Sequence, residues 1–132
     1  MFINEITQAF YNFIAPKISD DANKKVTVQF PTYEKIDCAI TSNKAEANVQ
    51  RTKQLVVVGS SALAAACTLT ATPSEDLEAG SEMYVKFSCG ATAYNVTVKK
   101  NSDDTGVALT GVSSSIVTKH LIWDGSNWIL IA

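Results

Sequence analysis

The last third of the chain consists of alternating apolar and polar segments separated by turn residues, and this pattern constrains the fold most. Its clearest part is the end, where the apolar runs Leu121–Trp123 and Trp128–Ile131 flank the polar residues Asp124–Asn127. Two apolar runs joined by four polar residues predict a β-hairpin. We therefore expect a small β-sheet module rather than an enzyme built on a catalytic motif.

Similar segments precede this hairpin along the chain. We expect strands at residues 26–30, 36–40, 55–58, 67–72, 83–89, 94–99, 107–111 and 116–123. Six or seven of these strands, the hairpin included, fit between residues 55 and 132, with turn residues at a spacing of roughly ten. This spacing favours a mainly β fold, an antiparallel β-sandwich or barrel-like module. No helical pattern recurs between the strands, so a parallel α/β sheet is not expected.

The N-terminal segment has a different, helical periodicity over residues 3–15. One apolar stripe recurs at intervals of three and four residues, formed by Ile3, Ile6, Phe10, Phe13 and Ile14. Pro16 prevents the helix from continuing. Because an isolated helix of this length is marginal in water, the stripe must pack on something. Two interpretations remain open: it covers the chain's own sheet, or it anchors the protein to a neighbouring subunit or particle.

The segment between the helix and the last strands has weaker patterns. Residues 41–54 are polar and mildly helix-favouring, and we interpret them as a linker or exposed segment. The predicted organisation is therefore an N-terminal helix with an attachment and linker segment, residues 1–54, followed by an antiparallel β module, residues 55–132. With 132 residues, the chain is long enough to bury one core without disulfide bonds.

Charge and hydropathy exclude several classes of partner. The net charge of −2 and the isoelectric point near 5.3 lack the basic surface that nucleic-acid binding requires. No apolar run is long enough to cross a bilayer, so no membrane partner is expected. The N-terminus has no basic region before its apolar residues, which argues against a signal peptide and for folding in a cytoplasm.

The residues that usually carry chemistry are few and scattered. Cys38, Cys67 and Cys89 have no metal-ligand spacing and are expected to be reduced thiols, at least two of them buried. His120 is the only histidine, and no Gly-x-Ser-x-Gly sequence accompanies it. Asp103 and its acidic neighbour lie in a loop without a recognised calcium spacing. We therefore predict no catalytic residues, no cofactor and no metal.

Two tryptophans allow two interpretations. Trp123 and Trp128 flank the four-residue turn of the terminal hairpin and are expected to lie close together. Tryptophans in this position usually cap the core at the end of a sheet. If their rings were exposed, they would instead provide a platform on which a sugar stacks.

The order of segments in residues 55–132 resembles a known class of proteins. The resemblance lies in Cys67–Thr72, Met83–Cys89, Gly90–Val98, Ala108–Gly111 and the closing Trp123–Trp128. This succession is similar to the small β modules of tailed-bacteriophage virion proteins, such as head decoration proteins, head fibres and tail appendages. The closing segment, an apolar strand, Asp-Gly-Ser-Asn, Trp and a second apolar strand, is its most specific element.

The resemblance implies a structural protein without enzymatic activity. It would be a dimer or trimer, would bind other virion proteins such as the capsid shell, and would be made in the host bacterial cytoplasm before joining the virion. The predicted N-terminal helix would then be its attachment element. The alternative function is a carbohydrate-binding or host-adhesion β-sandwich module that uses Trp123 and Trp128.

Overall fold

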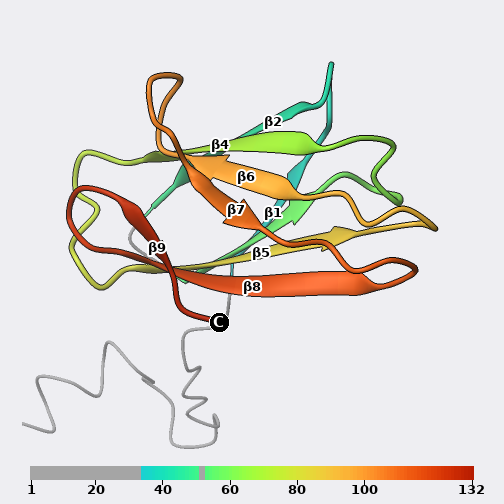
Figure 1. The fold of residues 1–132 in the computed structure, drawn as a ribbon. Helices are drawn as coiled ribbons and strands as arrows, with labels where there is room; N and C mark the ends of the chain where they lie inside the picture. The colour runs from blue at the N-terminus through green and yellow to red at the C-terminus, as the bar shows by residue number, and fades with distance from the viewer. Residues whose placement is uncertain (1–33, 51–52) are drawn as a thin grey trace, which may run out of the picture. The chain divides into compact units, whose positions relative to one another are not determined.

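Two facing β-sheets make up the part of the chain that the computed structural model describes, residues 34–50 and 53–132 (Figure 1). Sheet A has the strand order β1 (Glu34–Cys38), β3 (Gln54–Val58), β5 (Glu82–Ser88), β8 (Ile116–Trp123) and β9 (Trp128–Leu130). Sheet B has the order β2 (Lys44–Val49), β4 (Cys67–Pro73), β6 (Val96–Lys99) and β7 (Val107–Leu109). The prediction of a mainly β fold is confirmed.

The first six strands alternate between the two sheets, and this winding makes their pairing parallel. β1, β3 and β5 are parallel neighbours in sheet A, and β2, β4 and β6 are parallel neighbours in sheet B. The prediction of an antiparallel module is therefore wrong for these four pairings. Parallel neighbours need a crossover connection, which is usually a helix. Here the crossover is a strand of the opposite sheet, so no helical segment was needed in the sequence.

The last three strands reverse this direction. β7 pairs antiparallel with β6, and β8 lies antiparallel between β5 and β9. The predicted terminal hairpin is confirmed, with β8 ending at Trp123 and β9 beginning at Trp128. In its turn, Asp124 Oδ1 accepts hydrogen bonds from the N–H groups of Asn127 at 2.6 Å and Ser126 at 2.7 Å. These bonds lower the pKa of the Asp124 carboxyl, because they stabilise its charged form.

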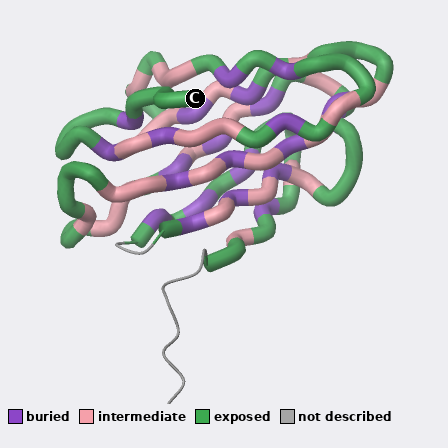
Figure 2. The backbone as a smooth tube through the Cα atoms, turned by 90° about the horizontal axis from the view of Figure 1, so that it is seen from below, coloured by how far each residue is buried: buried purple, intermediate pink, exposed green. Residues whose placement is uncertain are grey.

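Burial alternates along the strands, so one face of each sheet forms the core (Figure 2). In β3, β5 and β4 every second side chain is buried and those between are half-buried or more exposed. The largest fully buried side chains come from both sheets: Trp128, Phe87, Leu69, Met83, Leu109 and Leu121. The predicted core strands thus present the residues that their apolar periodicity indicated.

The described β module begins earlier than the sequence indicated. Residues 44–49 form β2, and β1 also lies before residue 55, so the segment interpreted as a linker belongs to the two sheets. In β2 the buried positions are Ala45, Ala47 and Val49, and the two alanines, which favour helices, give a weak strand signal. The predicted helix over residues 3–15 and the predicted strand at 26–30 lie outside the described residues.

Candidate docking surface

The outer face of sheet A carries several large apolar side chains among its polar ones. The register places Ile122 opposite both Glu82 and Ile129, and His120 opposite Tyr84, so these residues share the face that points away from the core. We call the apolar members of this surface the sheet A face: Leu55, Val57, Ile116, Ile122, Ile129 and Ile131. They come from β3, β8, β9 and the residue that follows β9.

The exposure of these side chains is high for aliphatic residues. Ile116 is 67% exposed, Ile131 54% and Ile129 42%, while the other three members are half-buried. Single exposed apolar residues are common on protein surfaces, and several on one side of a sheet are typical of an interaction site. Six aliphatic residues, three of them exposed, share the outer side of sheet A, with polar side chains of β5 and β8 between them, and we treat this surface as the candidate functional site.

A polar cluster lies within the sheet A face. The rings of Tyr84 and His120 stack with centroids 4.3 Å apart and planes 3° from parallel. Lys53 Nζ lies 3.0 Å from Glu82 Oε2. His120 Nε2 lies 3.2 Å from Glu82 Oε1, outside hydrogen-bond geometry, so this contact becomes an ion pair when the imidazole is protonated. The hydrogen bond with Lys53 is the main reason why the pKa of Glu82 falls below its ordinary value of 4.5.

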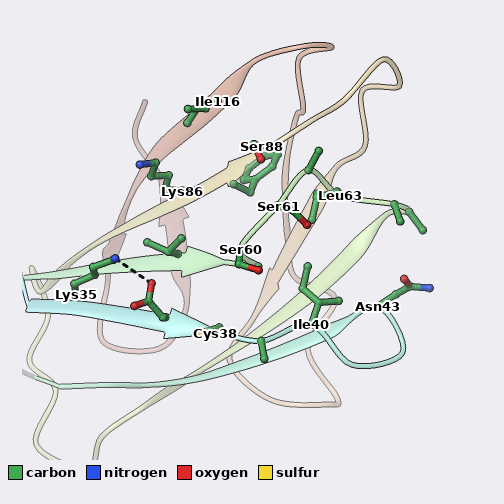
Figure 3. A pocket seen from close by; sticks show the side chains of 18 residues that line it. Lys35, Cys38, Ile40, Asn43, Ser60, Ser61, Leu63, Lys86, Ser88 and Ile116 are labelled. Atoms are coloured by element: carbon green, nitrogen blue, oxygen red, sulfur yellow. Dashed lines mark ion pairs between the residues drawn. The ribbon is translucent and has the colours of Figure 1, made fainter.

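A groove of about 930 Å³ extends the sheet A face at the ends of β1, β3 and β5 (Figure 3). Val57 and Ile116 line it from the sheet, and Ile40 and Leu63 line it from the loops that follow β1 and β3. Gly59 turns the chain out of β3 with a φ of 75°, and a Cβ there would lie 2.8 Å from Ile40 Cδ1. The close approach of Gly59 and Ile40 therefore depends on glycine.

The rim of the groove is partly basic. Lys35 and Lys86 both line it, and Lys35 forms an exposed ion pair with Asp37, 3.3 Å between Nζ and Oδ1 (Figure 3). His120 does not line the groove, so the histidine and the concave surface are separate features of sheet A. The groove thus adds apolar area to the sheet A face, and its only carboxylate among the described lining residues, Asp37, is exposed and paired with Lys35.

The outer face of sheet B has a different composition. Its positions are occupied by Lys44, Glu46, Asn48, Thr68, Thr70, Thr72, Thr97, Lys99 and Ala108. Thr68 lies between Lys44 and Thr97 in the ladder, and Thr70 lies between Glu46 and Lys99. Such a threonine-rich, charged surface suits contact with water. Both outer faces carry charged residues, but among the described residues only that of sheet A also carries large aliphatic side chains.

The structure places both tryptophans in the core. Trp123 is 6% exposed and Trp128 is 2% exposed, and their rings meet edge to face with centroids 5.1 Å apart. The indole N–H of Trp128 donates to the carbonyl oxygen of Ala71 at 3.0 Å, which joins β9 in sheet A to β4 in sheet B. This is the core-capping arrangement. Sugar stacking by these rings would need exposed faces that neither presents.

The other expected groups also lie where no site assembles around them. Cys38, Cys67 and Cys89 are free thiols and all three are buried, as predicted. Burial raises the pKa of Cys38 and of Cys67, because it disfavours the thiolate. Within residues 34–50 and 53–132, no three His, Cys, Asp or Glu side chains are grouped so that they could hold a metal ion. Nor do those residues contain a helix long and apolar enough to cross a membrane.

Sequence reasoning placed the assembly anchor elsewhere. The predicted anchor of Ile3, Ile6, Phe10, Phe13 and Ile14 lies outside the described residues, so it stays a prediction. The sheet A face was missed, although a signal for it existed. Residues 55–58 and 129–131 are continuously apolar and do not alternate, which is unusual for strands with one face in water. No protein-family model, curated protein or solved structure matches this chain.

Proposed function

We propose that this chain is a non-enzymatic structural protein that acts through self-assembly and docking on a larger particle. The observation that carries the proposal is the sheet A face, in which six aliphatic side chains share one side of a sheet. Burying such a surface against another protein is favourable by about 25 cal/mol per Å² of apolar area. Subunits that stay together permanently tend to have apolar interfaces of this kind.

The particle that we propose is a bacteriophage virion, which the protein would join after synthesis in the bacterial cytoplasm. The support for this part is the resemblance of residues 55–132 to the β modules of head decoration proteins, head fibres and tail appendages. The sheet A face supports it independently of sequence, since a decorating protein needs one surface for its neighbours and another for solvent. The outer face of sheet B has the composition of the solvent side.

Self-assembly is tested with charged substitutions on the two outer faces. Val57→Lys with Ile116→Lys places two cations on the sheet A face, away from strand β9. Thr70→Lys with Thr97→Lys is the matched control on sheet B. Sedimentation equilibrium over a wide concentration range should show oligomers for the unsubstituted protein and the control, and weakened association for the sheet A variant. A protein that remains a monomer at every concentration would contradict self-assembly.

The virion assignment needs a separate measurement. An antibody raised against this protein should label purified phage particles that carry the gene for it, as seen by immunogold electron microscopy. When each variant replaces the unsubstituted protein during infection, the antibody should label particles made with the sheet A variant less than particles made with the sheet B control. Particles that lack the protein altogether would refute the virion assignment, while leaving self-assembly as a property of the chain.

A further inference from the structure

The two sheets have four edge strands within the described residues, and they differ in how they discourage pairing. β1 carries the charged residues Glu34, Lys35 and Asp37, and β2 carries Lys44 and Glu46. Charged side chains on an edge strand oppose pairing with another chain. β7 is only three residues long and exposes a single side chain, that of Ala108. Charged side chains thus protect β1 and β2, and the short length of β7 and its mostly covered side chains protect the third edge.

The fourth edge, β9, is also three residues long, but it carries no charged side chain and exposes two large apolar ones, Ile129 and Leu130. From Trp128 to Ala132 the chain has no charged residue, and Ile129, Leu130 and Ile131 are 42%, 38% and 54% exposed. The contact with β8 continues beyond the strand through a β-bulge, in which Ile131 and Ala132 both lie opposite His120. The N–H groups of Ile131 and Ala132 donate to the His120 carbonyl at 2.8 and 3.4 Å, and His120 N–H donates to the Ala132 carbonyl at 2.9 Å. The regular apolar edge therefore runs from Trp128 to the N–H of Ile131.

The backbone of this edge presents hydrogen-bonding groups away from β8. In an antiparallel ladder, successive residues direct their N–H and C=O groups alternately to either side. Asp124 N–H donates to the carbonyl of Asn127 and Ile131 N–H donates to that of His120, so residues 127, 129 and 131 face β8. Leu130 therefore directs its N–H and C=O away from β8, and no described strand lies beyond β9.

We infer that β9 pairs antiparallel with β9 of a second copy of this chain, about a twofold axis at Leu130. Such an axis brings each Leu130 opposite its counterpart, so that the two residues exchange both main-chain hydrogen bonds. It also places Ile129 of each copy directly opposite Ile131 of the other, on the outer side of the sheet. Directly opposed residues that are not hydrogen-bonded have the closest side chains in a ladder.

The self-complementary spacing is the reason why the partner is a second copy. Four isoleucine side chains, two from each chain, form one cluster on the same side as the sheet A face. The pairing also joins two five-stranded sheets into one and makes the two sheet A faces continuous. This inference rests on the proposed function and adds to it the geometry of the dimer that would dock on a particle.

The direct test uses a sample that mixes isotope-labelled and unlabelled protein. An intermolecular nuclear Overhauser effect between the Hα atoms of Ile129 and Ile131 is expected, because these residues face each other only across the dimer axis. Leu130→Pro removes the edge N–H while leaving the donors of residues 129 and 131 in place, and proline is tolerated at an outward-facing edge position. Ile131→Lys removes the cross-strand pairs and serves as the second variant if the first does not fold.

Sedimentation equilibrium measures the effect of both variants. We expect the dissociation constant of the dimer to rise about tenfold in each, since each loses two symmetry-related interactions of about 0.7 kcal/mol. Val112→Lys, which removes an exposed aliphatic side chain (53% exposed) outside the strands, should leave the constant unchanged. If the protein associates but neither variant weakens it and no Hα contact appears, the β9 dimer is wrong and self-assembly stands. If the unsubstituted protein never associates, both the β9 dimer and the proposed self-assembly are wrong.

Discussion

The outer faces of the two sheets arise from the same strand alternation, yet they carry different side chains. Sheet A presents Ile116, Ile122 and Ile129 to the outside on β8 and β9, and sheet B presents Thr68, Thr70 and Thr97 to the outside on β4 and β6. Threonine and isoleucine are both β-branched and favour strands, so strand formation does not require the difference. The choice between isoleucine and threonine decides instead for which outer face the removal from water is favourable.

The largest effect on the free energy of unfolding is expected at Trp128, which joins sheet A to sheet B. Trp128→Ala should lower the free energy of unfolding by about 3–5 kcal/mol, because it removes a buried aromatic side chain and leaves a cavity. Trp128→Phe keeps most of the ring and loses the hydrogen bond to the Ala71 carbonyl, so about 1–3 kcal/mol is expected. Urea unfolding measures both, and equal losses for the two variants would show that the hydrogen bond has no separate role.

The second effect concerns the composition of sheet B. Replacing Thr68, Thr70 and Thr97 by isoleucine gives this sheet an outer face like that of sheet A. The variant should gain a new, concentration-dependent association, while its free energy of unfolding changes by about 1 kcal/mol or less. Light scattering detects the association, and serine at the same three positions is the control. If the isoleucine variant associates no more than the serine variant, apolar composition alone does not make a docking face.

The smallest effect is electrostatic and belongs to the cluster within the sheet A face. The pKa of Glu82 is lowered in the folded protein, chiefly by its hydrogen bond with Lys53, so the unfolded chain binds the proton more readily. The stabilisation is therefore present above about pH 4.5 and is lost as the pH falls through the lowered pKa. It should amount to about 1 kcal/mol or less, because the pair is partly exposed.

The Glu82→Gln variant lacks the ionisable carboxyl, so its stability should fall less between pH 7 and pH 3 than that of the unsubstituted protein. Thermal unfolding recorded from pH 7 down to pH 3 measures it, with Glu46→Gln on the outer face of sheet B as the control for losing one carboxylate. An acid profile for Glu82→Gln that coincides with that of the unsubstituted protein would show that the contacts with Lys53 and His120 contribute nothing to folding.

Local patterns predicted the strands well, because alternation is a property of neighbouring residues. Residues 83–89 and 116–123 were expected as strands and occur as Glu82–Ser88 and Ile116–Trp123. The partner of each strand was not predictable in the same way. A period of two indicates which side is buried but does not distinguish a parallel from an antiparallel neighbour. Because the chain alternates between the two sheets, the crossovers between parallel strands are themselves strands and not helices. Residues 44–49 form one of these crossovers, strand β2.

The candidate site was harder to predict for the same reason. Continuous apolar runs such as residues 55–58 and 129–131 are typical of strands buried on both sides, as in the interior of a larger sheet. Only the sheet order shows that their second side points outward and that Ile116 and Ile122 join them. The sequence therefore contained the apolar residues of the docking surface but not their assembly into one surface.

Solvent accessibility of individual methyl groups tests the docking surface most directly. With a soluble paramagnetic agent present, NMR relaxation should show the methyl groups of Ile116, Ile122 and Ile129 shielded at high protein concentration and accessible after dilution. The methyl groups of Thr68 and Thr70 should be equally accessible at both concentrations. Isoleucine methyl groups that remain accessible at every concentration, or threonine methyl groups that become shielded instead, would contradict the assignment of the sheet A face as the surface of assembly.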